Sequence, residues 1–185
     1  ESRSIGAGGG SIARLNPVLG NRLEVGPQSA GSMPGPACYD LGGTEPTVTD
    51  ADVVLGYLNP DYFHGGKIKL DRQKAVDAIR EKIAKPLQIE VPEAAWLIKK
   101  IVDGHMGSEI FKETVLKGYD PREFVVFAYG GGGPTHCCGY AFGAGIPKVV
   151  TFPNSPVFCA LGSAVMDTVQ FYEMSRHILL MRPVT

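Results

Sequence analysis

The stretch FVVFAYGGGGPTHCCGYAFG, residues 124–143, predicts a strand, a glycine turn and a helix in direct succession. Residues 124–129 form a continuous apolar run, as expected for a strand that is covered on both faces of a parallel sheet. Pro134 is expected to open the helix, because the first helical turn needs no N–H at that position. Gly145 is expected to end it.

The turn between that strand and helix consists of Gly130, Gly131, Gly132 and Gly133, which we call the second glycine turn. Consecutive glycines cost backbone entropy and pack no side chain, so they make sense where a ligand approaches the main chain closely. The free N–H groups of the following helix attract phosphate and other anions. A tight strand-to-helix turn without a ligand is the alternative interpretation.

The alternation of strands and helices continues to the end of the chain. Residues 148–152 predict another buried strand, residues 157–169 a helix and residues 171–181 a final strand. This order is typical of an α/β fold, and we expect a mostly parallel sheet with flanking helices.

The preceding residues divide into a loop-rich part and a helical part. In the helical part Asp71 is a suitable N-cap, Pro86 is expected to end the first helix, and Pro92 suits the first turn of the second. In the loop-rich part we expect short strands at 12–15 and 23–25 and a short helix capped by Thr49. The 185 residues are thus expected to form a single domain or a fragment with three parts: 1–66 loop-rich, 70–116 helical and 124–181 alternating.

Composition limits the classes of function. The chain has 18 basic and 19 acidic residues, a balance that favours neither nucleic acid nor an anionic membrane as a partner. It opens on Glu1, without a methionine and close to a glycine cluster, so we expect a fragment of a larger protein. The four cysteines, at positions 38, 137, 138 and 159, have neither CxxC nor zinc-finger spacing, which favours reduced thiols in the cytoplasm.

A first glycine turn precedes the strand at 12–15 and consists of Gly8, Gly9, Gly10 and Ser11. It lacks the lysine of a P-loop. It fits the dinucleotide-binding pattern only formally, because a strand and not a helix is expected to follow. Two side-chain-free turns in one short chain are explained together if a nucleotide lies between them.

Several polar residues are candidates for chemistry. His136 lies early in the helix after the second glycine turn, where it could reach a phosphate, transfer a proton, or only pack. Asp50 is either a helix-start acid or a metal-facing carboxylate. Cys137 and Cys138 are interpreted as small buried side chains, with redox chemistry as the alternative. His64, His105 and His177 show no metal-ligand spacing, so the sequence leaves a metal site unknown.

Six motifs, taken in order, resemble the hydantoinase A/oxoprolinase family. They are GAGGGSIA (6–13), VGPQSAG (25–31), PGPACY (34–39), PTVTDA (46–51), KGYDPR (117–122) and YGGGGPTH (129–136). The resemblance extends over nearly the whole chain. The form Gly-Pro-Thr-His-Cys at 133–137, where many members have Gly-Pro-Leu-His-Ala, is closer to the ketone carboxylase branch.

The resemblance implies a fold and an activity. The family includes ATP-dependent 5-oxoprolinases, N-methylhydantoinases and subunits of acetone and acetophenone carboxylases. Its A-type subunits have an actin-like, ribonuclease H-like ATPase core, of which this chain would be the C-terminal lobe. The first glycine turn would then be a phosphate loop and the second the adenosine-side turn.

The resemblance also implies cofactors and partners. The cofactor would be ATP with Mg or Mn, used to phosphorylate a carbonyl before cyclic amide hydrolysis or ketone carboxylation. Asp50 and His136 are the candidate catalytic residues. The partners would be the N-terminal lobe of the same full-length chain, a B-type hydantoinase subunit, a small third subunit and a small-molecule carbonyl substrate. A non-catalytic scaffold lobe of a multisubunit enzyme is the alternative.

Overall fold

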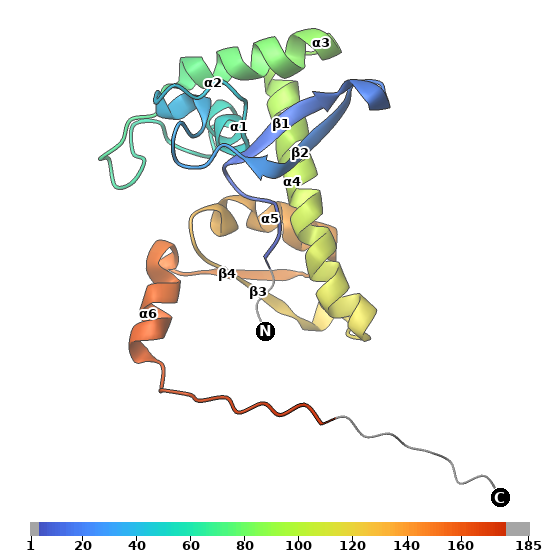
Figure 1. Ribbon diagram of the computed structural model, residues 1–185, viewed down its shortest axis with the longest axis vertical. Coiled ribbons are helices and arrows are strands. Elements are labelled where there is room, and N and C mark those ends of the chain that lie inside the picture. Colours follow the sequence, from blue (N-terminus) through green and yellow to red (C-terminus); the bar gives the residue numbers. More distant parts are fainter. Residues whose placement is uncertain (1–3, 177–185) are drawn as a thin grey trace, which may run out of the picture.

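The computed structural model describes residues 4–176 and shows a body with one long helix, α4, running through it (Figure 1). The chain begins with an antiparallel hairpin of β1 (Ser11–Asn16) and β2 (Arg22–Ser29), in which Ala13 lies opposite Val25. This hairpin confirms the two short strands expected at 12–15 and 23–25. Ala13 and Val25 are buried and anchor the hairpin to the core.

The helical part follows as α1 (Val48–Leu55), α2 (Arg72–Ile79), α3 (Lys85–Leu87) and α4 (Val91–Thr114). Asp71 caps α2 and Pro92 lies in the first turn of α4, as predicted. The cap of α1 is Thr47 and not Thr49, because Thr47 and Asp50 form a reciprocal capping box in which each side chain accepts the other's backbone N–H.

Pro86 does not end the helix after Asp71, contrary to the prediction. The chain passes from α2 through a π-helical segment, Arg80–Ala84, into α3, and Gln88 in the left-handed conformation then ends it. A proline inside a helix lacks an N–H and clashes with the carbonyl four residues earlier. The wider π turn relieves this conflict because its hydrogen bonds span five residues.

The last part is β3 (Val125–Ala128), α5 (Gly132–Ala144), β4 (Lys148–Thr151) and α6 (Phe158–Val165). β3 and β4 pair in parallel, from Val125 opposite Lys148 to Ala128 opposite Thr151. Gly145 caps α5 as predicted. The helix starts at Gly132 and not at Pro134. Pro134 is tolerated in the first turn because the N–H that it lacks would have no helical partner there.

The predicted single, mostly parallel sheet is not found in residues 4–176. These residues form a mixed α/β structure with two two-stranded sheets, of which only β3–β4 is parallel. Residues 171–176 have no regular structure, and the rest of the predicted final strand lies outside the described residues. The strand β3 is not covered on both faces either, since Phe127 is 59% exposed.

Helix α4 links two hydrophobic clusters. Its N-terminal half contributes Ile98 and Val102 to the larger cluster, which also contains α1, α2 and the hairpin. Its C-terminal half contributes Met106 and Ile110 to a smaller cluster beneath α5 and the β3–β4 sheet. Within residues 4–176, no helix is long and apolar enough to cross a membrane.

Candidate functional site

The first glycine turn is closed on itself and seated on the start of α1. The Ser11 N–H donates to the Gly8 carbonyl and the Gly8 N–H donates to Ser11 Oγ, both at 3.0 Å. The Gly9 carbonyl accepts from the Thr49 N–H at 2.8 Å and from Thr49 Oγ1 at 2.9 Å. Thr49, predicted to cap α1, instead fixes the glycine turn to this helix.

Only part of the first glycine turn leaves space for a ligand. A Cβ added at Gly9 would lie 2.7 Å from Thr49 Oγ1, and one added at Gly10 would lie 2.7 Å from Ser29 Oγ. The space in front of Gly9 and Gly10 is therefore filled by these two hydroxyl groups. A Cβ at Gly8 would meet nothing within 4 Å, so the main chain faces open space at this glycine.

The second glycine turn is anchored by its main chain and open on its other side. The Gly130 N–H donates to the Ser155 carbonyl at 2.7 Å, and Tyr140 Oη donates to the Gly133 carbonyl at 3.0 Å. A Cβ added at Gly130, Gly131 or Gly132 would meet nothing within 4 Å. The turn thus combines a fixed backbone with free space at the N-terminal end of α5, the end of a helix that favours anions.

A buried cluster of charged side chains joins three helices at His136. The ring nitrogen Nδ1 lies 2.6 Å from Asp103 Oδ1 of α4, and Nε2 lies 3.1 Å from Asp52 Oδ2 of α1. Lys99 Nζ, one turn before Asp103 on α4, lies 2.8 Å from Asp103 Oδ2. His136 is 1% exposed, so the structure brings it against charged residues of α1 and α4 and away from solvent.

Charge balance explains how this cluster is tolerated inside the protein. Burial by itself lowers the pKa of His136, but the hydrogen bonds to Asp103 and Asp52 outweigh burial and raise this pKa to about 9. The imidazolium and the Lys99 ammonium then balance two carboxylates. Buried charges are stable only when paired in this way.

Sequence reasoning identified His136 but missed its three partners. Lys99 and Asp103 are four residues apart on α4, and both lie on a side of the helix that is largely apolar. Asp52 lies in α1, which is buried from Val48 to Val54. Charged residues at core positions were the available signal, because such residues are rarely buried unless they are paired.

Asp50 lies in a different cluster, away from His136. Its carboxylate accepts the N–H groups of Cys38 at 2.8 Å, Ala37 at 3.2 Å and Thr47 at 2.8 Å, and the Thr47 hydroxyl at 2.8 Å. The side chain is fully buried. The geometry corresponds to the helix-start interpretation, with the carboxylate tying the 37–38 turn to α1.

The cysteines and the remaining histidines do not form a reactive or metal-binding group in the described part of the chain. All four cysteines are free, and burial raises the pKa of the Cys137 thiol, which is the opposite of what an attacking thiolate needs. Among residues 4–176, no three His, Cys, Asp or Glu side chains are arranged to hold a metal ion. His177 lies outside the described residues.

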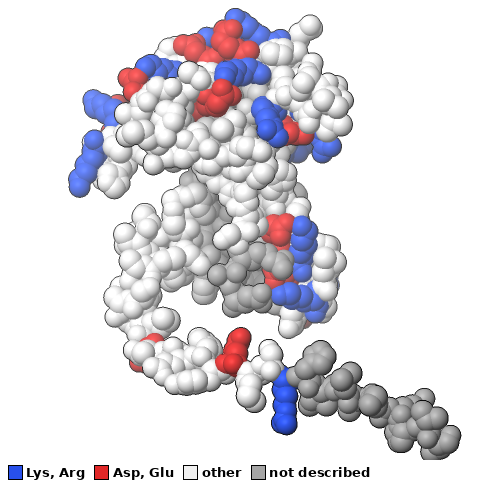
Figure 2. Space-filling view, viewed as in Figure 1, with Lys and Arg blue, Asp and Glu red and all other residues white. Residues whose placement is uncertain are grey.

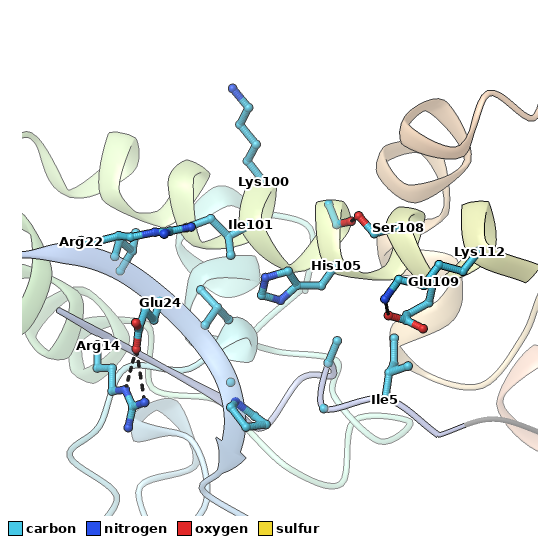
Figure 3. A pocket seen from close by; sticks show the side chains of 17 residues that line it. Ile5, Arg14, Arg22, Glu24, Lys100, Ile101, His105, Ser108, Glu109 and Lys112 are labelled. Carbon is cyan, nitrogen blue, oxygen red and sulfur yellow. Dashed lines mark hydrogen bonds and ion pairs between the residues drawn. The ribbon is translucent and has the colours of Figure 1, made fainter. Parts of the chain in front are cut away.

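A wide groove of about 890 Å³ separates β2 from α4, but its basic side chains do not converge (Figure 3). Arg14 is paired with Glu24 at 3.2 Å, and Lys112 is paired with Glu109. Lys100 points away from the groove and lies over the Trp96 ring. Arg14, Lys100 and Lys112 therefore do not form a focused anion site in this groove.

The mixed α/β fold, with glycine turns beside helix N-termini, defines the structural class of the chain as a mixed α/β domain. More specifically, it belongs to the hydantoinase/oxoprolinase family, whose model matches residues 1–171. It is 61% identical over all 185 residues to the gamma subunit of acetophenone carboxylase from Aromatoleum aromaticum. It is 47% identical over 168 residues to the alpha subunit of caprolactamase from Pseudomonas jessenii, covering 90% of this chain.

Solved structures agree with this assignment. Nucleotide-free acetone carboxylase superposes with a TM-score of 0.81 at 41% identity, and the ATP-dependent caprolactamase from Pseudomonas jessenii with 0.80 at 46%. Each match covers 88% of this chain and 23% of the other chain. The chain spans about a quarter of the length of these relatives, 25% and 24% for the two sequences above. The resemblance seen in the motifs is confirmed.

Proposed function

We propose that this chain is the nucleotide-binding lobe of an ATP-dependent enzyme of the hydantoinase/oxoprolinase type. In this proposal the chain forms the C-terminal half of an actin-like core. The observation that carries the proposal is the attachment of both glycine turns to α1. Thr49 of α1 binds the first turn through Gly9, and Asp52, one turn later, binds the helix of the second turn through His136. Residues three apart lie on one face of a helix. Both glycine turns are thus attached to the same face of α1.

The residues around the turns suit the parts of a nucleotide. Gly131 and Gly132 of the second glycine turn carry main-chain amides without side chains in front of them, and such amides hold phosphate oxygens in fixed positions. At Gly8 the main chain also faces open space, although its own N–H is bonded to Ser11 Oγ. A groove of about 770 Å³ beside Gly133 is lined by Phe127, Tyr129 and Tyr140, which suits a flat, aromatic base. ATP, with Mg or Mn, would supply the phosphoryl group.

The proposed reaction is phosphorylation of a carbonyl oxygen. The relatives include ketone carboxylases and a caprolactamase, and both kinds of substrate contain a carbonyl. The Gly-Pro-Thr-His-Cys form at 133–137 favours ketone carboxylation over cyclic amide hydrolysis. The second candidate is a non-catalytic scaffold lobe. Binding of Mg-ADP to this chain alone would favour the first candidate, because a scaffold lobe has no reason to bind it. In the full-length subunit the test is whether substitutions in this lobe weaken that binding.

Substitution of Gly131 by alanine is expected to weaken Mg-ADP binding at least tenfold in the full-length subunit. The new methyl group fits the fold, since nothing lies within 4 Å, but it occupies the space that a phosphate would need. Isothermal titration calorimetry measures the effect. Gly143→Ala at the far end of α5, also with free space, is the matched control and should bind normally. Equal affinities for the two variants would contradict the assignment of the second glycine turn.

The proposed partner is the remainder of the same subunit, docked on the apolar surface around β3, β4 and α6. Lys148 is the only Lys, Arg, Asp or Glu between residues 124 and 166, and this region is largely uncharged in Figure 2. Leu161 and Val165 are 45% and 76% exposed. Helix α6 is held through Phe158, whose ring packs on Phe152 and Tyr129. Parallel sheets are normally covered on both faces.

Leu161→Ser is therefore expected to have different effects in two contexts. In the isolated chain it should change the free energy of unfolding by less than about 0.5 kcal/mol, because the side chain is half exposed. In the full-length subunit it should cost about 2 kcal/mol, because burial there would be complete. Urea unfolding measures both values. Val18→Ser, at an exposed site on the far hairpin, is the control, and a small effect of Leu161→Ser in both contexts would argue against docking on α6.

A further inference from the structure

We infer that Asp52, Lys99, Asp103 and His136 form a positioning clasp that sets the second glycine turn against α1, the helix that carries the first. This inference rests on the proposed function only for its consequence in nucleotide binding. His136 is the fifth residue of α5, directly behind the second glycine turn. Asp52 and Asp103 hold its ring from α1 and α4. The clasp thus lies where the two hydrophobic clusters meet on α4.

The two contacts between ring nitrogens and carboxylates favour a protonated ring. Both ring nitrogens face carboxylate oxygens, and only the imidazolium can donate from both nitrogens at once. A neutral ring would keep only one of these two bonds, with Nδ1 facing the Lys99 ammonium at 3.3 Å as well as Asp103. Asp52 depends on this bond in particular, since its other oxygen, Oδ1, is buried without a hydrogen-bond partner among the residues that the structure describes.

No other titratable group that faces the His136 ring can replace the positive charge that the ring carries when protonated. From α1 the ring faces Asp52, and from α4 it faces Asp103 and Lys99, with Tyr57 beneath the Lys99 ammonium at 4.9 Å. On α5 the neighbouring titratable groups are Cys137 and Tyr140, and burial raises the pKa of both. Loss of the His136 proton would therefore leave one net negative charge buried between the three helices.

The close packing of α4 on α5 is a second, independent observation that supports the clasp, because it leaves space for the Asp103 carboxylate. A Cβ added at Gly139 would lie 2.0 Å from Asp103 Oδ2, whereas one added at Gly143, one turn later, would meet nothing within 4 Å. Glycine at 139 thus leaves the room that the Asp103 carboxylate occupies. The pair Gly139→Ala and Gly143→Ala makes the same chemical change on one helix, with and without displacement of the clasp.

Three measurements on this chain test the inference at pH 7. The His136 ring protonation is followed by nitrogen NMR, the opening of α5 by amide hydrogen exchange at residues 133–141, and Mg-ADP affinity by calorimetry. Gly139→Ala should speed exchange at least tenfold and shift the ring titration towards that of a free histidine. Gly143→Ala should change neither. Affinity for Mg-ADP should fall with Gly139→Ala in the full-length subunit and remain unchanged with Gly143→Ala.

A milder variant guards against loss of the fold. Asp52→Asn keeps the volume and one acceptor but removes the charge. The ring should therefore lose its proton at a lower pH, where the proton activity is at least tenfold higher than for wild type, with α5 still folded. A wild-type ring that titrates like a free histidine would overturn the clasp, as would identical exchange in the two glycine variants. Absence of Mg-ADP binding in the wild-type subunit would reject the proposed function alone, because the ring and exchange measurements need no nucleotide.

Discussion

Replacement of Asp50 by alanine is expected to lower the free energy of unfolding by about 4 kcal/mol, a large share of the ~5–15 kcal/mol of a typical domain. The carboxylate accepts four hydrogen bonds and is fully buried. Its removal leaves the N–H groups of Ala37, Cys38 and Thr47 and one hydroxyl without their acceptor. A buried donor without an acceptor has lost its hydrogen bonds to water and gains none in the protein, so it lowers the free energy of unfolding.

Chemical denaturation of Asp50→Ala and two companion variants measures this effect. Asp50→Asn should fall between wild type and alanine, at about 2 kcal/mol, because it keeps the volume but only one acceptor oxygen. Asp61→Ala, at an exposed acid in the following loop, is the control and should stay within about 0.5 kcal/mol. A stable Asp50→Ala variant that has lost only catalytic activity would instead favour the role of Asp50 as a reacting group.

The local elements were predictable where one residue type decides the backbone. Gly145 and Asp71 end and begin helices as expected, since a left-handed cap and an N-cap depend on single residues. Pro86 was misjudged because the π-helical segment that accommodates it depends on the surrounding packing. The extent of the sheet was also beyond the local pattern, because an apolar strand such as β3 looks the same whether or not its second face is covered.

In the candidate site, too, features set by local sequence could be predicted and features set by packing could not. The two glycine turns could be found from sequence, since runs of bare residues are visible in any chain. The clasp could not, because Asp52, Asp103 and His136 come from three helices separated by up to 84 residues, and their meeting depends on how these helices cross. Asp50 and Asp52 illustrate the limit. They are two residues apart on α1, yet one accepts main-chain bonds beside its own helix and the other accepts a bond from α5.

A rise in pH from 6.5 to about 9.5 is expected to lower the free energy of unfolding of the wild-type chain by about 3 kcal/mol through His136. Burial opposes its charge, but the bonds to Asp103 and Asp52 raise its pKa to about 9, above the ~6.5 of an unfolded histidine. The folded state therefore holds this proton more tightly. Its stabilising contribution is complete below pH 6.5 and is lost as the pH rises through 9. At about 1.4 kcal/mol for each factor of ten in proton affinity, the difference amounts to about 3 kcal/mol.

Urea unfolding across this pH range, on wild type and His136→Gln, isolates the contribution. Glutamine can donate towards only one carboxylate and does not titrate, so the variant should be less stable at pH 6.5 and nearly independent of pH up to 9. His105→Gln makes the same change at an exposed position of α4 and should keep the wild-type slope. A wild-type stability that stays level, or rises, between pH 7 and 9 would show that the ring is neutral in the folded chain. In that case the folded and unfolded chains would bind the same number of protons in this range, and the attachment of α5 to α1 would not depend on the charge of His136.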